Sequence, residues 1–251
     1  MTDLYGHNLD INYENFVTQC PYSDCKNVNI FNRASDLETF KYIDCKEVEC
    51  FKCKQKFNIK SDYVGEKHEY LIYDCYELLK QKRYMYCIIN LCIACEAFFF
   101  KGIEIKLLWK PWKEKIFERD TEMFNRFSHK LYKKTQDYTY SKLLNVFFDL
   151  YLKNKPFVSL TSIEDYINKM DCFVETTPKD KDVRKFHDPK TAVLLMNLKK
   201  LKINEIRNDV AHKYAVRPSR QSAVKYLEEV RSVIFNLEAR LKVKRVIEYC
   251  N

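Results

Sequence analysis

The segment 207–212, Arg-Asn-Asp-Val-Ala-His, places a guanidinium and an imidazole five positions apart. His212 can exchange a proton near neutral pH, and Arg207 offers a planar fork of donors to phosphate oxygens. On a continuous helix Asn208 and His212 share a face, and Arg207 lies about 100° to one side and can reach round on its long stem. All three side chains can therefore converge on one phosphate. The spacing alone also fits a surface helix end, where cations interact favourably with the helix dipole.

Phosphodiester chemistry on RNA is the reaction that these residue types suit. Cleavage without a metal needs the 2'-hydroxyl deprotonated, the leaving 5'-oxygen protonated and the added negative charge at phosphorus stabilised. One histidine and one arginine meet most of these needs. Arg207 and His212, with Asn208 beside them, are therefore candidates for this chemistry.

Glu96 is a carboxylate within an apolar helical pattern, one position after Cys95 and four after Cys92. Burying an unpaired carboxylate costs several kcal/mol, so Glu96 is expected to meet a cation, and Arg207 or His212 is the expected partner. The alternative is that Glu96 tips toward a solvated groove or pairs with a lysine.

Two close cysteine pairs, Cys20 with Cys25 and Cys50 with Cys53, lie near the N-terminus. Tetrahedral zinc is commonly held by four thiolates delivered as two such pairs, and a four-thiolate site is closed to water and hence structural. Cys45 is a competing fifth ligand, and partly buried free thiols are the alternative interpretation. A segment of about 60 residues with few apolar runs also needs a staple in order to fold.

The Cys-Pro opening of the first pair, and the Cys-x-x-Cys of the second followed by Phe57, resemble a zinc ribbon. We therefore expect a small β-rich zinc-ribbon domain over residues 1–64 and a helical domain over residues 65–251, with the boundary near Gly65. The ribbon would hold structural zinc and serve binding instead of catalysis.

Composition favours a mainly α fold. The hydrophobic fraction of 46% is ample for a packed core, and three glycines in 251 residues leave no P-loop and no dinucleotide fingerprint. The net charge of +9 has the sign that suits a polyanion, and it also fits a lysine-biased surface. No signal peptide pattern is visible, which favours a reducing cytoplasm. The apolar stretch 87–100 is too short to span a bilayer, so it is expected to be a buried core helix.

Apolar residues at steps of three and four predict the helices that must position these groups. A pair of helices is expected from two stripes (Leu71, Cys75, Leu78; Met85, Ile88, Cys92, Cys95, Phe99, Ile103). Short helices are expected over 143–152, which Pro156 ends, and over 162–170. Residues 176–189 are expected to form a mobile polar loop.

The segment 207–212 is expected to end one long helix capped by Thr191 and carrying a third stripe (Leu194, Leu198, Leu201, Ile206, Val210). Pro218-Ser219 is expected to start a last helix with a heptad-like stripe (Leu227, Val230, Ile234, Leu237, Leu241). This last stripe can pack within a bundle or form a dimer seam.

Residues 66–244 resemble the HEPN family, whose members share a helical bundle and an Arg-x4-6-His motif, often with Asn after the Arg as in Arg207-Asn208. The resemblance implies a metal-independent endoribonuclease that leaves cyclic phosphate ends, dimerises with two motifs facing one cleft, and acts as a toxin or antiviral effector. It implies Arg207 and His212 as the catalytic pair, Asn208 as their positioning neighbour, and Glu96 as the acidic residue that many members carry on the second helix. The insert 109–140 has no simple counterpart.

The expected protein is thus a homodimeric ribonuclease with RNA as substrate, structural zinc, no cofactor for catalysis, and an antitoxin or regulatory partner. The alternative function is a non-catalytic module, built from ribbon and bundle, that binds nucleic acid or protein. A zinc deaminase site at the cysteines is the weakest interpretation, because the His-x-Glu element of that chemistry is missing near them.

Overall fold

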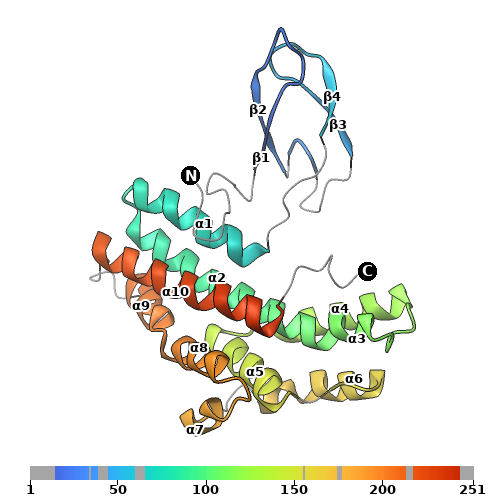
Figure 1. Cartoon of the computed structure of the whole chain (residues 1–251), viewed down its shortest axis with the longest axis vertical. Coiled ribbons are helices and arrows are strands. Elements are labelled where there is room, and N and C mark those ends of the chain that lie inside the picture. Colours follow the sequence, from blue (N-terminus) through green and yellow to red (C-terminus); the bar gives the residue numbers. More distant parts are fainter. Residues whose placement is uncertain are drawn as a thin grey trace.

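The N-terminal part of the protein consists of four short strands. The structure, a computed structural model, describes residues 15–33, 35–38, 45–59, 66–154, 156–173, 177–212 and 217–243. For Asn15, Val17 and His212 it describes the backbone alone. Strands β1 (Asn15–Gln19) and β2 (Val28–Asn32) form one antiparallel hairpin, and β3 (Lys46–Glu49) and β4 (Lys56–Ile59) form another (Figure 1). Their inner faces share a small core with Phe31 and Phe57 at its centre. The expected small β region is therefore present, and Gly65 lies outside the described residues.

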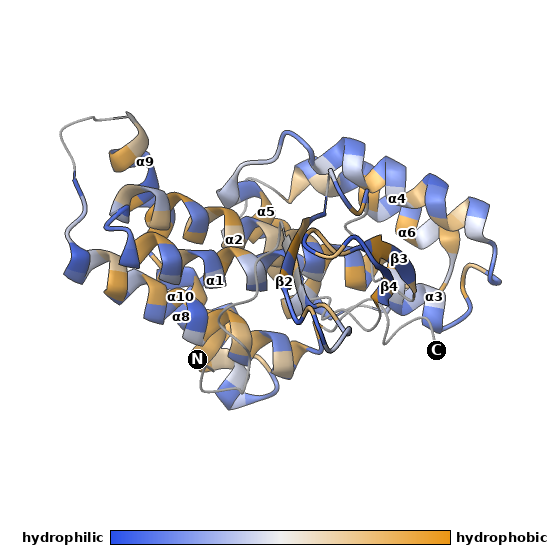
Figure 2. Cartoon of the chain, turned by 90° about the horizontal axis from the view of Figure 1, so that it is seen from above, coloured by the Kyte–Doolittle hydropathy of each residue, from blue (hydrophilic) through white to orange (hydrophobic). Residues whose placement is uncertain are grey.

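Helices make up the rest of the described chain, which confirms the mainly α prediction. In chain order they are α1 (Lys67–Lys80), α2 (Tyr84–Glu104), a π segment (Ile105–Trp109), α3 (Lys110–Lys113), α4 (Thr121–Thr135), α5 (Tyr140–Lys153), α6 (Leu160–Lys169), a 3-10 turn (Met170–Cys172), α7 (Asp180–Arg184), α8 (Pro189–Lys200), α9 (Ile203–His212) and α10 (Arg220–Leu241). The outer helices α1, α4 and α10 alternate between hydrophilic and hydrophobic residues (Figure 2), as expected where one face packs inward.

Helix α2 is the centre of the helical core, and α1, α5, α9 and α10 pack against it. The predicted stripe from Ile88 to Ile103 is fully buried along it. Gly102 lets α5 approach, because a Cβ there would meet the Phe147 ring at 2.6 Å. The stretch Tyr84–Lys113 is long and apolar enough to cross a membrane by composition, but it is mostly buried among the other helices. The expected core helix is thus confirmed.

Helices α1 and α2 form the predicted pair, although the deepest residues of α1 are Ile72, Tyr73 and Cys75, with Leu71 and Leu78 only partly buried. Helix α10 begins after Ser219, whose side chain accepts from the backbone N–H of Ser222. Its stripe from Leu227 to Leu237 is buried against α2, α8 and α1. Of the two roles considered for this stripe, packing within the bundle is therefore the one observed.

The single long helix expected from Thr191 was wrong, because the structure has two helices with a bend between them. Asp188, and not Thr191, caps α8 by accepting from the N–H groups of Lys190 and Thr191, and Pro189 occupies the first turn. Leu201 is extended (φ −61°, ψ 122°) and ends α8. The step of five from Leu201 to Ile206 explains the bend: on a straight helix it turns the stripe by about 140° away from the core.

The remaining predicted segments are confirmed in part. Helix α5 covers the predicted 143–152, and α6 with the first residue of the 3-10 turn covers 162–170. The expected polar loop 176–189 contains the short helix α7, anchored by the buried Val183 and by an ion pair between Lys199 and Asp180, so the expectation of a wholly irregular loop was wrong. Thr176 lies outside the described residues. The insert 109–140 folds as α3 and α4, which cover the core with Trp112, Phe117 and Phe127.

Candidate metal centre and candidate active site

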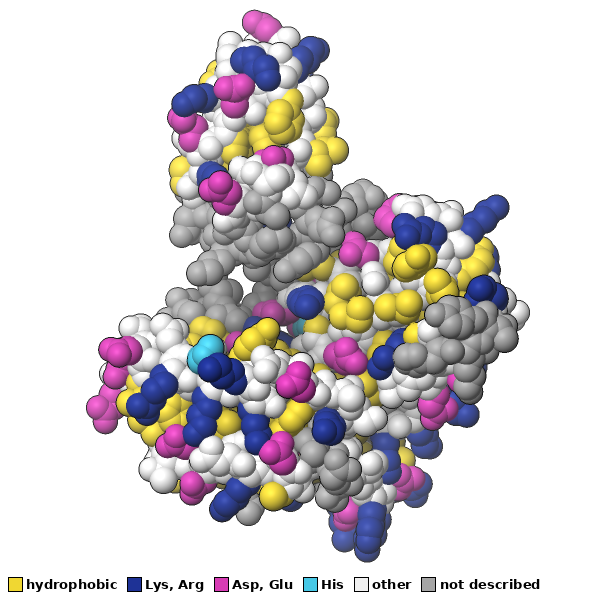
Figure 3. Space-filling view, turned by 180° about the vertical axis from the view of Figure 1, so that it is seen from behind, with side chains coloured by type: hydrophobic (Ala, Val, Ile, Leu, Met, Phe, Trp, Pro, Cys, Tyr) yellow, Lys and Arg dark blue, Asp and Glu magenta, His cyan; other side chains and the backbone are white. Residues whose placement is uncertain are grey.

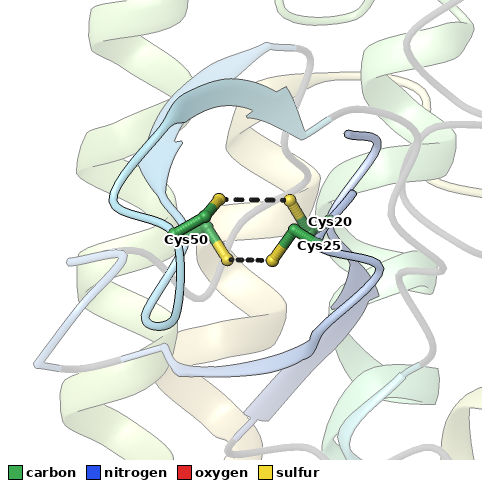
Figure 4. Close-up of side chains that lie close together, drawn as sticks. Cys20, Cys25 and Cys50 are labelled. Carbon is green, nitrogen blue, oxygen red and sulfur yellow. Dashed lines mark hydrogen bonds between the residues drawn. The ribbon is translucent and has the colours of Figure 1, made fainter. Parts of the chain in front are cut away.

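The four cysteines expected to hold zinc come together between the two hairpins. Cys20 and Cys25 lie in the β1–β2 turn, and Cys50 and Cys53 lie in the β3–β4 turn. Their sulfurs are all within 4.8 Å of one another, and the pairs Cys20–Cys53 and Cys25–Cys50 are each 3.7 Å apart (Figure 4). A tetrahedral zinc with Zn–S bonds of about 2.3 Å requires S···S separations of about 3.8 Å. The four thiols are therefore spaced to hold one metal ion.

The two turns that carry these cysteines have the same local geometry. Directly after the second cysteine of each pair stands a lysine with positive φ, Lys26 at 45° and Lys54 at 62°. The N–H of Lys26 donates to the carbonyl of Tyr22 at 3.1 Å, and the N–H of Lys54 donates to the carbonyl of Cys50 at 3.0 Å. The left-handed residue closes each turn, so that both sulfurs of a pair point to one side.

The thiols also differ in acidity in a way that suits a shared cation. Burial opposes ionisation of Cys50, but the N–H groups of Cys53 and Lys52 donate to its sulfur and lower its pKa to about 6. Burial raises the pKa of the Cys20 thiol to about 12. Four thiols this close together do not all ionise unless a positive charge lies between them.

Two polar contacts hold the hairpins together beside the cysteines. Asn29 is fully buried, and its Oδ1 accepts from the N–H of Phe51 at 2.9 Å, while the Tyr22 hydroxyl donates to the carbonyl of Lys56 at 2.7 Å. Sequence reasoning missed Asn29. Its signal was a polar residue at an inward position of the alternating strand β2.

Cys45 does not belong to the cluster. It is exposed, and among the described residues the group that can hold a metal consists of Cys20, Cys25, Cys50 and Cys53 alone. The predicted ligand set is therefore brought together by the structure, and the competing fifth ligand is not part of it.

Helix α9 brings Arg207 to Glu96 of α2, as expected for the half-buried carboxylate. Arg207 Nη2 lies 3.8 Å from Glu96 Oε1 and donates to Asn204 Oδ1 at 2.9 Å. Partial burial raises the pKa of Glu96, and the charges of Arg207 and Lys67 oppose that rise. Asn204, one turn before Arg207, was missed by sequence reasoning. The i, i+3 spacing to Arg207 was the signal that could have found it.

Glu96 also faces solvent, so both sequence interpretations of this residue apply. A cavity of about 400 Å³ lies beside it between α1, α2, α4 and the start of α5, and its wall includes Lys67, Lys101, Tyr132 and Tyr138. Lys101 is buried between Glu66 at 3.2 Å and Glu104 at 3.3 Å. Glu96, the acidic member of the pair, thus lines an open groove.

The other predicted catalytic residues are placed by backbone alone or at the surface. His212 is the last residue of α9, one helical turn after the exposed Asn208, and its side chain lies outside the described part of the structure. The structure brings Arg207 and Glu96 together and puts Asn208 and His212 on the same helix. It gives no position for the imidazole.

Comparisons with protein-family models, with curated proteins and with solved structures gave no match.

Proposed function

We propose that this protein is a metal-independent endoribonuclease of the HEPN type, acting as a toxin or antiviral defence effector. The observation that carries the proposal is the contact of Arg207 with Glu96, because it places the one arginine of the Arg-Asn-x-x-x-His segment at the junction of α9 and the central helix α2. Glu96 also lines a groove, so the pair is not sealed in the core.

In this proposal each residue has a separate part. Arg207 binds the non-bridging phosphate oxygens and stabilises the charge that builds up during in-line attack by the 2'-hydroxyl. His212 transfers the proton, and Asn208 on the same helix positions the substrate. Glu96 and Asn204 act as positioning residues, since they hold the guanidinium without using all of its five donors.

One chain supplies one Arg207 and one His212, whereas the reaction needs both a base and an acid. A homodimer in which two α9 helices face one RNA strand would supply both. The apolar stripe of α10 is buried inside the bundle, so the proposed seam uses other surfaces, and the exposed side of α9 with Asn208 is the nearest to the motif.

The four cysteines are proposed to hold structural zinc, because soft thiolates in tetrahedral spacing favour this ion in a reducing compartment such as the cytoplasm. A closed four-thiolate site offers no open position to substrate. The catalytic step therefore uses protein groups alone, and an antitoxin or other regulatory partner would control it.

Incubation of purified protein with total RNA in EDTA tests the proposal. The wild type is expected to cleave RNA and leave 2',3'-cyclic phosphate ends, whereas Arg207→Ala and His212→Ala are expected to lower the rate by about a thousandfold. Arg126→Ala and His129→Ala are matched controls, because both residues are exposed on α4. Cleavage that survives either motif substitution, with helicity intact by circular dichroism, would falsify the proposal.

Glu96→Gln distinguishes a positioning role from a structural one. The amide keeps the shape of the side chain but removes the charge that faces Arg207, so kcat is expected to fall about tenfold with the protein still folded. An unchanged kcat would mean that the ion pair does not position Arg207. The melting temperature serves as the control measurement, because a purely structural role would lower it together with activity.

A non-catalytic binding module is the second candidate, and the surface of the ribbon favours it. Val28 and Ile30 are 60% and 56% exposed on β2, and Phe51 is 51% exposed in the β3–β4 turn. Figure 3 shows hydrophobic side chains exposed on this part of the molecule, among basic and acidic ones. Stable RNA binding without cleavage by the wild type would support this second function.

A further inference from the structure

The β1–β2 hairpin of the ribbon exposes hydrophobic side chains on its outward face. In β2, Asn29 and Phe31 point into the ribbon core. Val28 and Ile30 alternate with them along the strand and are therefore directed outward, where they are 60% and 56% exposed. Phe51, 51% exposed, lies beside the same strand, because its N–H donates to Asn29 Oδ1 and its ring centroid is 5.0 Å from that of Phe31. We call Val28, Ile30 and Phe51 the hairpin patch.

The β3–β4 hairpin of the same ribbon has a charged outward face instead. Its exposed strand positions are Glu47 and Glu49 in β3 and Lys56 and Asn58 in β4. Lys56 Nζ lies 2.9 Å from Glu47 Oε1 across this face. By contrast, no residue is charged in β1, Asn-Phe-Val-Thr-Gln, or in β2, Val-Asn-Ile-Phe-Asn. The exposed apolar side chains of β2 are therefore not a general result of the small size of the ribbon.

The helical domain has no comparable cluster among its described residues. Its large exposed hydrophobic side chains lie in four different segments (Tyr86, Tyr132, Val158, Val193). One of them is partly covered, because the guanidinium of Arg83 lies 4.4 Å from the centroid of the Tyr86 ring. Single exposed hydrophobic residues are normal on a soluble protein, whereas a group of them marks a contact surface. A protein contact is therefore expected at the hairpin patch.

We propose that the hairpin patch binds the hairpin patch of a second copy of this chain. A contact across a two-fold axis brings the same surface of both copies together, so charged side chains there would face like charges. The uncharged strands β1 and β2 avoid this repulsion, and depletion of charge is typical of the core of protein interfaces. A nucleic-acid partner would require cations beside the apolar residues, and neither strand supplies one.

The size of the hairpin limits the strength of this contact. Two strands of five residues present a face of about 17 Å by about 10 Å, whereas a stable interface buries about 800 Å² on each copy. We therefore expect a dimer with a dissociation constant in the micromolar range. Such a contact would raise the effective concentration of the two α9 helices for each other. This consequence rests on the proposed function, whereas the contact itself does not.

Sedimentation equilibrium of the full chain across the micromolar range tests the inference. The wild type is expected to dimerise reversibly, with little change as salt is raised, because the contact is apolar. Ile30→Lys is expected to weaken association by about tenfold or more, since it places a charge inside the contact. Asn58→Lys is the matched control, because it adds the same charge at an exposed outward position of β4, and it should leave association unchanged.

An exchange of charge shows whether the occupant is a second copy. Ile30→Lys and Ile30→Glu are each expected to remain monomeric, because like charges would meet across the two-fold axis. An equal mixture of the two variants is expected to associate. A mixture that remains monomeric, or a wild type that is monomeric over the whole concentration range, would overturn the proposal.

A second variant guards against misfolding of Ile30→Lys. Ile30→Thr keeps a β-branched side chain and is expected to weaken association by about threefold, with the hydrogen exchange of the ribbon unchanged. Equal weakening by Asn58→Lys and Ile30→Lys would overturn the proposal in favour of a general charge effect. Dimerisation that is lost in Asn208→Lys on α9 but kept in Ile30→Lys would overturn the ribbon contact and leave the α9 seam standing. No cleavage is measured, so the nuclease proposal and this one can fail separately.

Discussion

The ribbon and the helical domain are held together by different means. Seven buried apolar side chains form the described core of the ribbon, and two of them are the metal-spaced cysteines Cys20 and Cys50. The helical core is several times larger and is continuous along α2. A core as small as that of the ribbon rarely supports a fold without a staple, whereas the bundle needs none. We therefore expect the order of the ribbon to depend on a bound metal, and that of the bundle on packing.

Removal of one cysteine of the cluster is the largest test of this contrast. Cys50→Ser is expected to abolish stoichiometric zinc binding and to expose the ribbon to rapid hydrogen exchange, because three thiolates leave the tetrahedral site open. The helical domain should keep its melting transition. Zinc content by mass spectrometry and peptide-resolved hydrogen exchange measure the two effects.

Cys45→Ser is the matched control, since Cys45 is exposed and outside the cluster. It should leave zinc content and exchange unchanged. A lower melting temperature of the helical domain in Cys50→Ser would show that the two regions depend on each other for stability, and would contradict the contrast drawn between them.

A packing defect in the bundle is the converse test, with a smaller effect. Gly102→Ala would add helix propensity worth about 1 kcal/mol, but its Cβ would lie 2.6 Å from the Phe147 ring and force α5 away. Overpacking of this kind costs about 1–3 kcal/mol, so a net loss of unfolding free energy is expected in urea melts. Zinc content should not change.

The double variant Gly102→Ala with Phe147→Leu identifies the cause. If the clash with the ring is responsible, the double variant should be more stable than the sum of the two single effects predicts. A Gly102→Ala protein more stable than the wild type would mean that Phe147 moves aside at little cost, and that the close approach of α5 is not a constraint.

Much of this organisation could be predicted from sequence where one residue type has one physical use. Two cysteine pairs predicted the cluster, and the apolar steps of three and four from Ile88 to Ile103 predicted the central helix. The carboxylate of Glu96 predicted a cationic partner, because an apolar stripe gives it few other options. These inferences depend on local chemistry or on helical period, both of which are visible in the chain.

What could not be predicted depends on contacts between distant segments. The bend at Leu201 lets α9 pack on α2, a contact with a distant segment; its one local signal, the step of five from Leu201 to Ile206, was not used in predicting a single helix. Asp188, not Thr191, caps α8, because its carboxylate accepts from the N–H groups of Lys190 and Thr191 and Pro189 follows it in the first turn. A cavity of about 580 Å³ beside Lys106 is lined by residues from 105 to 242, and no local pattern marks residues that far apart as neighbours.

The smallest effect is expected from substituting a lysine that follows a cysteine pair in the ribbon. Lys54 has a φ of 62°, a region that glycine occupies without the cost of about 1 kcal/mol that a Cβ brings. Lys54→Gly should therefore tighten zinc retention by a few fold at most, measured by competition with a chromophoric chelator. The Lys54 side chain contributes little else, because both partners of its ion pair with Glu49, 3.7 Å apart, are exposed.

Lys52→Gly is the control, since Lys52 lies in the same turn but has no positive φ. This substitution should weaken zinc retention, because the added chain freedom relieves no strain there. Equal effects of the two substitutions would mean that flexibility, and not the left-handed turn, governs how the ribbon holds its metal.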